Sequence, residues 1–240
     1  MKLKIIFLTL SLQSFNVSLS FVVRPARSLK TLLNDKLSSD DTNRERALDL
    51  LSETRKRTNG NCLRYDGSTI DTKQNREIWG GNAGKILSFL PSKIPNEDSL
   101  LWQVYTEAIM YKTSSKGIVK GISSGSAFAF LKAVDNLVKN HAKQDNGVAF
   151  IFDGAYHLAA PWPAKSNKKA MSSFQRALEI EPESKRNLYY IGVAAYVMKE
   201  RGMASKYFKR AIDAKCLSST EEDIEQFLSF EAEKGLKALK

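Results

Sequence analysis

The sequence of 240 residues has little cysteine and little histidine. Its two cysteines, Cys62 and Cys216, exclude a disulfide-rich scaffold and a zinc or iron–sulfur site built from four thiolates of one chain. Its two histidines, His141 and His157, leave few ligands for metal chemistry, and we predict neither a metal site nor a cofactor. No long hydrophobic stretch follows the first twenty residues, so we expect no transmembrane span in the mature chain.

Motifs typical of enzymes are also missing. The stretch Gly80–Ile86 resembles a phosphate-binding loop, which needs four residues between its first glycine and its Gly-Lys pair, then a hydroxyl side chain. Here Gly80 leaves only three residues before Gly84-Lys85, and Ile86 has no hydroxyl. We therefore predict no catalytic residues and a protein that is not an enzyme.

The first twenty residues have the pattern of a secretory signal peptide. Two lysines precede an apolar run, Ile5–Leu12, which is too short to span a bilayer as a helix. Small residues stand at Ser18 and Ser20, as at a cleavage site. We predict a signal peptide over residues 1–20 and cleavage between Ser20 and Phe21.

Residues 21–41 have the composition of a transit segment, because several basic residues precede the first acid at Asp35. The sequence Val17–Phe21 resembles the junction in the bipartite plastid leaders of diatoms and their relatives, where a phenylalanine follows the signal peptide. The resemblance implies a plastid location, in the stroma or at the plastid periphery. The alternative is that the protein is simply secreted.

The remainder is predominantly helical in pattern. Thr42 would cap a first helix that ends at Asn59-Gly60, and residues 62–81 are expected to form a loop with a small hairpin at Asp66-Gly67. Later helices are expected over residues 82–90, 98–112, 126–140 and 146–160, with three or four more beyond. We divide this part into an N-terminal segment (42–96), a repeat domain (97–216) and a C-terminal capping helix (217–240).

An internal repeat gives the most specific signal in the sequence. Three positions recur after 34 residues: Ala170, Phe174 and Ala177 return as Ala204, Phe208 and Ala211. Gly192 lies twelve residues before Ala204, and Pro182 follows the first set.

This pattern resembles the tetratricopeptide repeat (TPR), in which small residues let the two helices of a hairpin approach and an aromatic ring fills the gap. Gly154 precedes Ala170 by sixteen residues instead of twelve, which inserts a loop at Ala160–Pro163. In this the sequence is similar to the divergent TPR-like subunits of bacterial TRAP-type transporters. The resemblance implies an all-α fold, a right-handed α-solenoid of helical hairpins with degenerate hairpins at its N-terminal side.

The last segment is expected to cover the end of this array. Ser219 and Glu222 have the spacing of a capping box, and Ile224, Phe227 and Leu228 would form the buried face of the helix. The first helix of the second hairpin would place Arg186, Tyr189, Val193 and Tyr196 on the concave face of a TPR-like array.

The charge is uneven. The chain carries +11, or +9 without Lys2 and Lys4, and residues 164–215 hold twelve Lys and Arg against five Asp and Glu. Such an asymmetry favours an acidic partner, an anionic membrane surface or a nucleic acid. The function predicted first is a protein–protein interaction scaffold or assembly factor that holds an acidic or extended peptide in the concave groove.

Two alternatives remain open at this stage. One is a protein that binds a small ligand in a pocket between the Trp162 loop and the helix from Asn146, as the transporter resemblance suggests. The other is a basic RNA-binding repeat, which is less favoured because charge alone does not make a nucleic-acid site. The sequence leaves open the partner's identity, the oligomeric state, and whether residues 62–81 fold back over the groove.

Overall fold

The computed structural model describes residues 39–117, 120 and 125–240. The predictions for the leader, including cleavage between Ser20 and Phe21, lie outside these residues. The described residues fall in one compact unit, Ser38–Lys240, which holds all the buried core residues of the structure.

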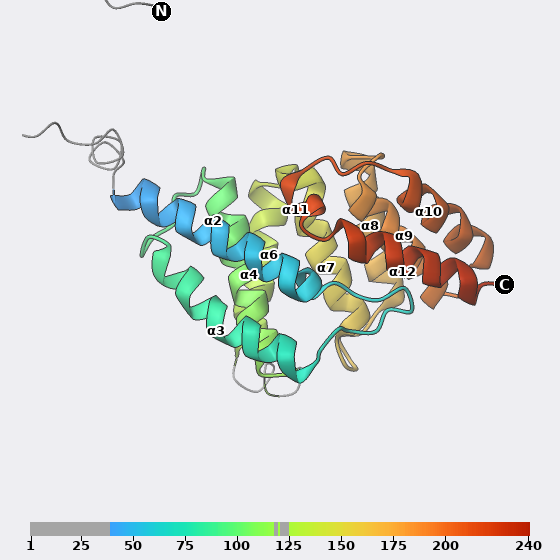
Figure 1. Cartoon of the computed structure of the whole chain (residues 1–240), viewed down its shortest axis with the longest axis horizontal. Coiled ribbons are helices and arrows are strands. Elements are labelled where there is room, and N and C mark those ends of the chain that lie inside the picture. The colour runs from blue at the N-terminus through green and yellow to red at the C-terminus, as the bar shows by residue number, and fades with distance from the viewer. Residues whose placement is uncertain (1–38, 118–119, 121–124) are drawn as a thin grey trace, which may run out of the picture. The chain divides into compact units, whose positions relative to one another are not determined.

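Within the described residues the secondary structure is helical and contains no strand, which confirms the all-α prediction (Figure 1). The helices are α2 (Ser39–Thr58), α3 (Lys73–Phe89), α4 (Ser99–Ser115), α6 (Ser126–Asn140), α7 (Val148–Ala159), α8 (Asn167–Ile180), α9 (Lys185–Val197), α10 (Arg201–Asp213), α11 (Ser219–Glu222) and α12 (Glu225–Ala238). Two 3-10 turns accompany them: η1 (Asn59–Asn61) follows α2, and η2 (Gln144–Gly147) lies between α6 and α7. None of these helices has the length and apolar character needed to cross a membrane.

Two predictions for the N-terminal segment were wrong. Helix α2 begins at Ser39, three residues before the predicted cap at Thr42. The loop expected to reach Gly81 ends at Thr72, whose hydroxyl accepts a hydrogen bond from Asn75 and caps α3. Gly80 and Gly81 lie on the exposed side of α3, each at a cost of about 1 kcal/mol relative to alanine, while the helix buries Trp79, Ala83 and Ile86.

The predicted hairpin at Asp66-Gly67 is present as a short turn. An isolated antiparallel bridge joins Leu63 to Thr69, and the amide of Arg64 donates to the carbonyl of Ser68 at 2.8 Å. Gly67 adopts a φ of 77°, a left-handed conformation that glycine reaches without steric cost. The turn therefore lets the segment Cys62–Ile70, named here the inner segment, run out and back between α2 and α3.

The two hairpins predicted from the repeat share the same internal contacts. Helix α8 packs on α7, and α10 packs on α9. The six repeated positions are at most 1% exposed: Ala170, Phe174, Ala177, Ala204, Phe208 and Ala211. A Cβ at Gly192 would lie 2.6 Å from the ring of Phe208, and a Cβ at Gly154 would likewise overlap the ring of Phe174. The small residues therefore allow the close approach that the aromatic rings fill.

Helix α12 packs against α9 and α10, as expected of a helix that covers the last hairpin. Ile224 and Leu228 are buried, as predicted, and Phe227 is half-buried. The N-terminal cap of α11 is Ser218, which accepts from the amide of Glu221, so the predicted capping box at Ser219 and Glu222 was one residue out of register.

A buried ion network joins the N-terminal and C-terminal parts of the unit. Arg55 of α2 donates to both oxygens of Glu107 in α4, at 2.9 and 3.0 Å, and to Asp223 at 3.0 Å. Burial opposes the charge on Arg55, but the Glu107 and Asp223 carboxylates together outweigh this effect and raise the pKa of the guanidinium above its ordinary value. The network fixes α2 across α4 and against the start of the C-terminal segment.

Candidate functional site

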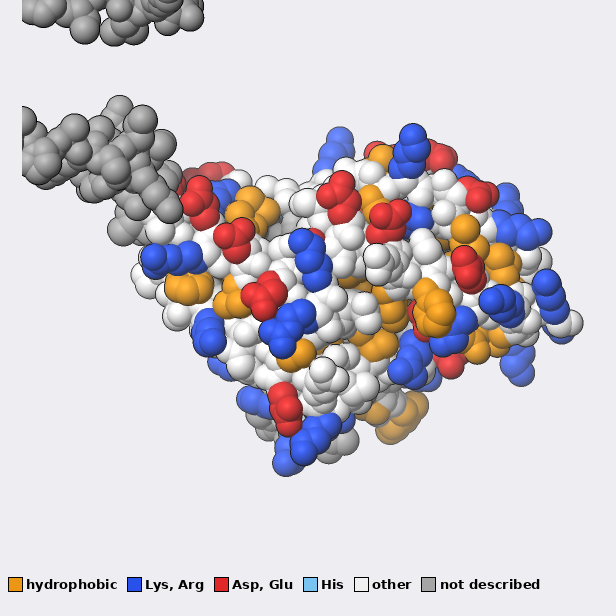
Figure 2. All heavy atoms as spheres, viewed as in Figure 1, with side chains coloured by type: hydrophobic (Ala, Val, Ile, Leu, Met, Phe, Trp, Pro, Cys, Tyr) orange, Lys and Arg blue, Asp and Glu red, His pale blue; other side chains and the backbone are white. Residues whose placement is uncertain are grey.

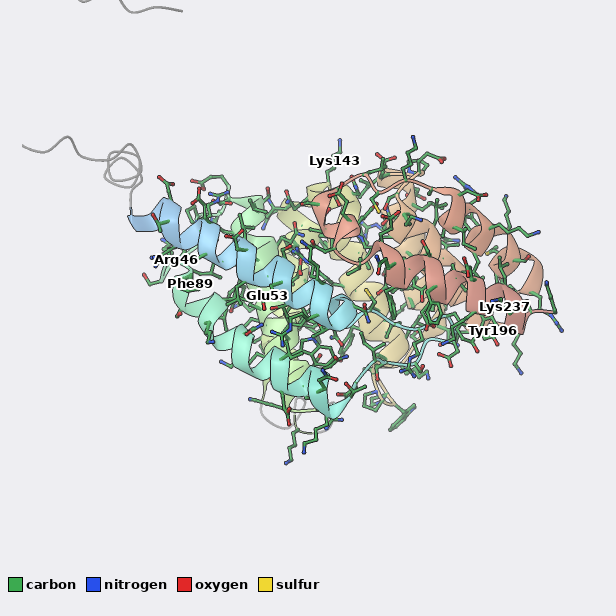
Figure 3. The ribbon with its side chains drawn as sticks, viewed as in Figure 1. Arg46, Glu53, Phe89, Lys143, Tyr196 and Lys237 are labelled. Carbon is green, nitrogen blue, oxygen red and sulfur yellow. The ribbon has the colours of Figure 1, made fainter. Side chains whose placement is uncertain are left out.

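The residues predicted to line a concave groove lie on α9, and three of them are buried. Arg186 is 4% exposed, and Tyr189 and Val193 are 0% exposed. Only Tyr196, labelled in Figure 3, reaches the surface, where it is half-buried. The prediction that these four residues line an open groove is therefore wrong for this structure.

Arg186 is occupied inside the protein. Its guanidinium donates to the Asp145 carboxylate at 3.0 Å and to the hydroxyl of Thr220 at 3.2 Å. Burial alone would raise the pKa of Asp145, but the charge of Arg186 and the hydrogen bonds to the carboxylate hold that pKa below its ordinary value. Arg186 thus pairs η2 with α11 and does not face an incoming carboxylate.

The inner segment fills the groove. The hydroxyl of Tyr189 donates to the carbonyl of Leu63 at 2.8 Å, and the hydroxyl of Tyr190 accepts from the Leu63 amide at 3.4 Å. The ring of Tyr65 meets that of Tyr196 edge to face, with centroids 5.2 Å apart. The inner segment therefore folds back over α9 at Leu63 and Tyr65, one of the outcomes that the sequence left open.

The described residues contain no cluster of three or more histidine, cysteine, aspartate or glutamate side chains that would hold a metal ion. Cys62 is 5% exposed, and its burial raises the pKa of the thiol to about 11. A thiol is nucleophilic as its thiolate, so Cys62 is unreactive in the folded protein. The residues Gly80–Ile86 lie within α3, where helical backbone cannot wrap a phosphate.

A cavity of about 130 Å³ lies at one end of the helical array. It is bordered by the C-terminal ends of α4 and α7, the start of α6, and the inner segment, and it is open to solvent. Its apolar lining consists of Leu63, Met110, Ala127, Phe130, Phe152, Ala155, Tyr156, Ala159, Ala160 and Pro161. Helix α7 and Pro161 form one of its walls, and the pocket predicted between the Trp162 loop and the helix from Asn146 would use this same wall.

The polar groups around this cavity are largely paired with one another. The Asn61 side-chain amide donates to the Ser114 hydroxyl at 2.8 Å, and the Thr113 hydroxyl donates to the Ile109 carbonyl at 2.8 Å. Asp71 is held by Arg76, whose Nη2 donates to it at 2.7 Å. A ligand in the cavity would therefore bind through apolar contact more than through hydrogen bonds.

The sequence predicted the wall of this cavity that α7 and Pro161 form, and it did not predict the walls from α4, α6 and the inner segment. The walls come from four separate segments, and no motif connects them. One signal was present on α7: Ala155 and Ala159 are four residues apart and leave a shallow strip on the helix face beside the larger Tyr156. The contribution of Leu63 depends on the course of the inner segment, which the sequence did not specify.

Comparisons of this chain with models of protein families, with curated proteins and with solved structures found no match.

Proposed function

We propose that this chain is a non-enzymatic binding protein made of TPR-like hairpins in a right-handed array, and that it holds a small apolar ligand in the cavity between α4, α6 and α7. The observation that carries this proposal is the apolar cavity, lined by residues such as Phe130, Phe152 and Ala155. The leader pattern supports a plastid as the place where it acts.

The size of the cavity limits the ligand. An apolar cavity of about 150 Å³ in another protein stays dry and accepts a benzene molecule. The cavity here, of about 130 Å³, has room for a group of similar size. We therefore propose an aromatic ring or a short alkyl chain as the buried group, with any larger polar portion of the ligand outside the mouth.

The first prediction uses straight-chain 1-alkanols as probes. Each added methylene contributes about 0.8 kcal/mol of burial, or about fourfold in affinity, until the cavity is full. We expect affinity measured by calorimetry to rise up to about six carbons and then to level off.

The Ala155→Leu variant should abolish this binding because its extra carbons occupy the cavity. The control is Ala238→Leu at the exposed end of α12, which should bind as the unaltered protein does. Equal binding by both variants, or affinity that does not depend on chain length, would show that the cavity is not the site.

A second candidate function, the interaction scaffold, keeps one specific observation in its favour. The groove over α9 holds an extended peptide, namely the inner segment, whose Leu63 backbone pairs with the hydroxyls of Tyr189 and Tyr190. A partner peptide would use the same contacts after displacing this segment. This function is less favoured, because the inner segment is part of the same chain and competes with any partner peptide for the groove at a high effective concentration.

The second prediction tests the groove with a synthetic peptide that copies residues 61–70. In a Leu63→Gly/Tyr65→Gly variant the internal segment is held less tightly, and we expect the peptide to bind this variant and not the unaltered protein. Fluorescence anisotropy of the labelled peptide measures both, and circular dichroism checks that the variant is folded. If the folded variant also fails to bind, the groove is purely a part of the core.

A further inference from the structure

The end of the array where the cavity opens exposes two aromatic side chains. Phe128 is 73% exposed and Trp162 is 89% exposed. Among the described residues, both exceed the other exposed large hydrophobic side chains, which are Met203, Leu217 and Phe230. Phe128 and Trp162 each follow directly on a residue of the cavity lining, Ala127 or Pro161. Large exposed rings are costly in water and mark surfaces that meet a partner or a membrane.

We name this end the mouth face and define it by residues 71–76, 112–117, 125–128 and 160–165. Figure 2 shows hydrophobic side chains projecting at the lower edge of the molecule, where Figure 1 places the loop after α7. Lys and Arg side chains gather at the same edge near the beginning of α3, with acidic side chain atoms beside them.

The described residues of the mouth face carry mainly positive charge. Its exposed cations are Lys73, Arg76, Lys112, Lys116 and Lys165. Its one acid is Asp71, which forms an ion pair with Arg76, so the excess positive charge of the face comes from its four lysines. The mouth face thus combines two projecting aromatic rings with a surrounding set of cations.

We infer that the mouth face docks on an anionic lipid surface, with Phe128 and Trp162 inserted at the headgroup level. Tryptophan is enriched at the boundary between lipid and water, because its ring has both apolar area and a polar N–H. Lysine and arginine side chains are attracted to anionic headgroups over about a Debye length. A lipid surface fits this face better than a protein does, because lipid presents one sign of charge at every position around the two rings.

Docking on lipid is a property separate from the proposed ligand site, and it would determine how a ligand reaches that site. The cavity would open toward the bilayer, so an apolar ligand would enter from lipid without crossing water. The docking itself uses exposed residues of the rim, and it does not require that the cavity be filled.

The third prediction concerns vesicle binding by the Ser38–Lys240 unit, which lacks the apolar run Ile5–Leu12 that would itself bind lipid. This unit contains the whole described core. We expect it to sediment with phosphatidylcholine vesicles that contain about 30% phosphatidylglycerol, more weakly as salt is added, and to remain in solution with phosphatidylcholine alone. Absence of binding to the anionic vesicles would overturn the inference.

Matched variants locate the surface. The Phe128→Ala/Trp162→Ala variant should bind at least about tenfold more weakly, because two apolar insertions are lost. Phe230→Ala removes a ring that is 58% exposed on α12 and should bind as the unaltered unit does. In the same way, Lys112→Gln should weaken binding and Lys139→Gln, at the far end of α6, should not.

Tryptophan fluorescence distinguishes docking through the mouth face from non-specific adsorption to vesicles. Trp79 is fully buried, and the half-buried Trp102 lies near the start of α4, away from the mouth face, with its indole N–H bonded to the Pro95 carbonyl. A blue shift of the emission on vesicle binding should therefore come mainly from Trp162 and disappear in Trp162→Ala. The Ala155→Leu variant should keep vesicle binding even though it loses alkanol binding, which distinguishes failure of the ligand site from failure of docking. If the double aromatic variant binds lipid normally but loses a protein partner, the face is a protein interface and the inference is wrong.

Discussion

Replacing Arg55 with alanine is expected to lower the free energy of unfolding by about 3–5 kcal/mol, because removing one partner of a buried ion pair leaves the other charge uncompensated. The carboxylates of Glu107 and Asp223 both lie within 3.0 Å of the Arg55 guanidinium, and their side chains are 5% and 6% exposed. Arg55→Ala would leave the Glu107 carboxylate with the neutral Gln103 side chain as its hydrogen-bond donor, whereas Asp223 keeps Lys56 at 3.4 Å and the Ser52 hydroxyl at 2.8 Å. Urea unfolding followed by circular dichroism measures the effect.

A second arginine on the same helix gives a matched control. Arg57 forms an ion pair with Glu53 at 3.0 Å, but both side chains are more than half exposed. Exposed pairs of this kind contribute little, so Arg57→Ala should change the stability by less than about 0.5 kcal/mol. Adding Glu107→Gln to Arg55→Ala should recover part of the loss, since it removes one stranded charge. Equal effects of the two arginine variants would show that water reaches the network.

The features that depend on local pattern were well predicted from the sequence. Helix α6 has the predicted bounds, Ser126–Asn140, and Asp98 caps α4 at the predicted start by accepting from the Leu101 amide. The repeated alanines and phenylalanines are buried as expected. These features are set by residues a few positions apart, or by one fixed period, and such signals are visible along a single sequence.

The groove could not be predicted correctly because its cover is distant in sequence. Leu63 contacts Tyr189 across more than a hundred residues, and no period links the inner segment to α9. The sequence of α9 nevertheless indicates that this helix is buried on all sides. From Leu188 to Ala195 the helix is apolar or aromatic on every side except at Gly192, and a helix that is hydrophobic all round is enclosed by its neighbours. The TPR pattern predicts, in contrast, that one face of this helix is open to a partner.

This burial also changes what the obvious groove variants would report. Arg186→Ala would strand the Asp145 carboxylate, and Tyr189→Ala would open a void in the core, so both are expected to destabilise the protein. Loss of partner binding in either variant would therefore not identify a contact surface. Tyr65 and Tyr196 are better probes, because both are half-buried where the inner segment meets the surface.

The second large effect is expected at Phe208, where alanine should lower the free energy of unfolding by about 3–5 kcal/mol. The ring is 0% exposed and lies between two helices that approach it with glycines. A Cβ at Gly192 of α9 would come within 2.6 Å of the ring, and a Cβ at Gly235 of α12 within 2.5 Å. Phe208 therefore joins the last hairpin to the helix that covers it, and its removal leaves a cavity that rigid helices cannot close.

A double-mutant cycle shows whether this fit between ring and glycine is the cause. Gly192→Ala should destabilise the unaltered protein by about 1–3 kcal/mol, since the added methyl overlaps the ring. In a Phe208→Leu background the same change should cost less, because the smaller side chain leaves room for the methyl and alanine favours the helix. Purely additive effects would mean that Gly192 and Phe208 do not act as a pair. The repeat predicts the same coupling between Gly154 and Phe174, so finding it in one hairpin and not in the other would contradict the structural equivalence of the two.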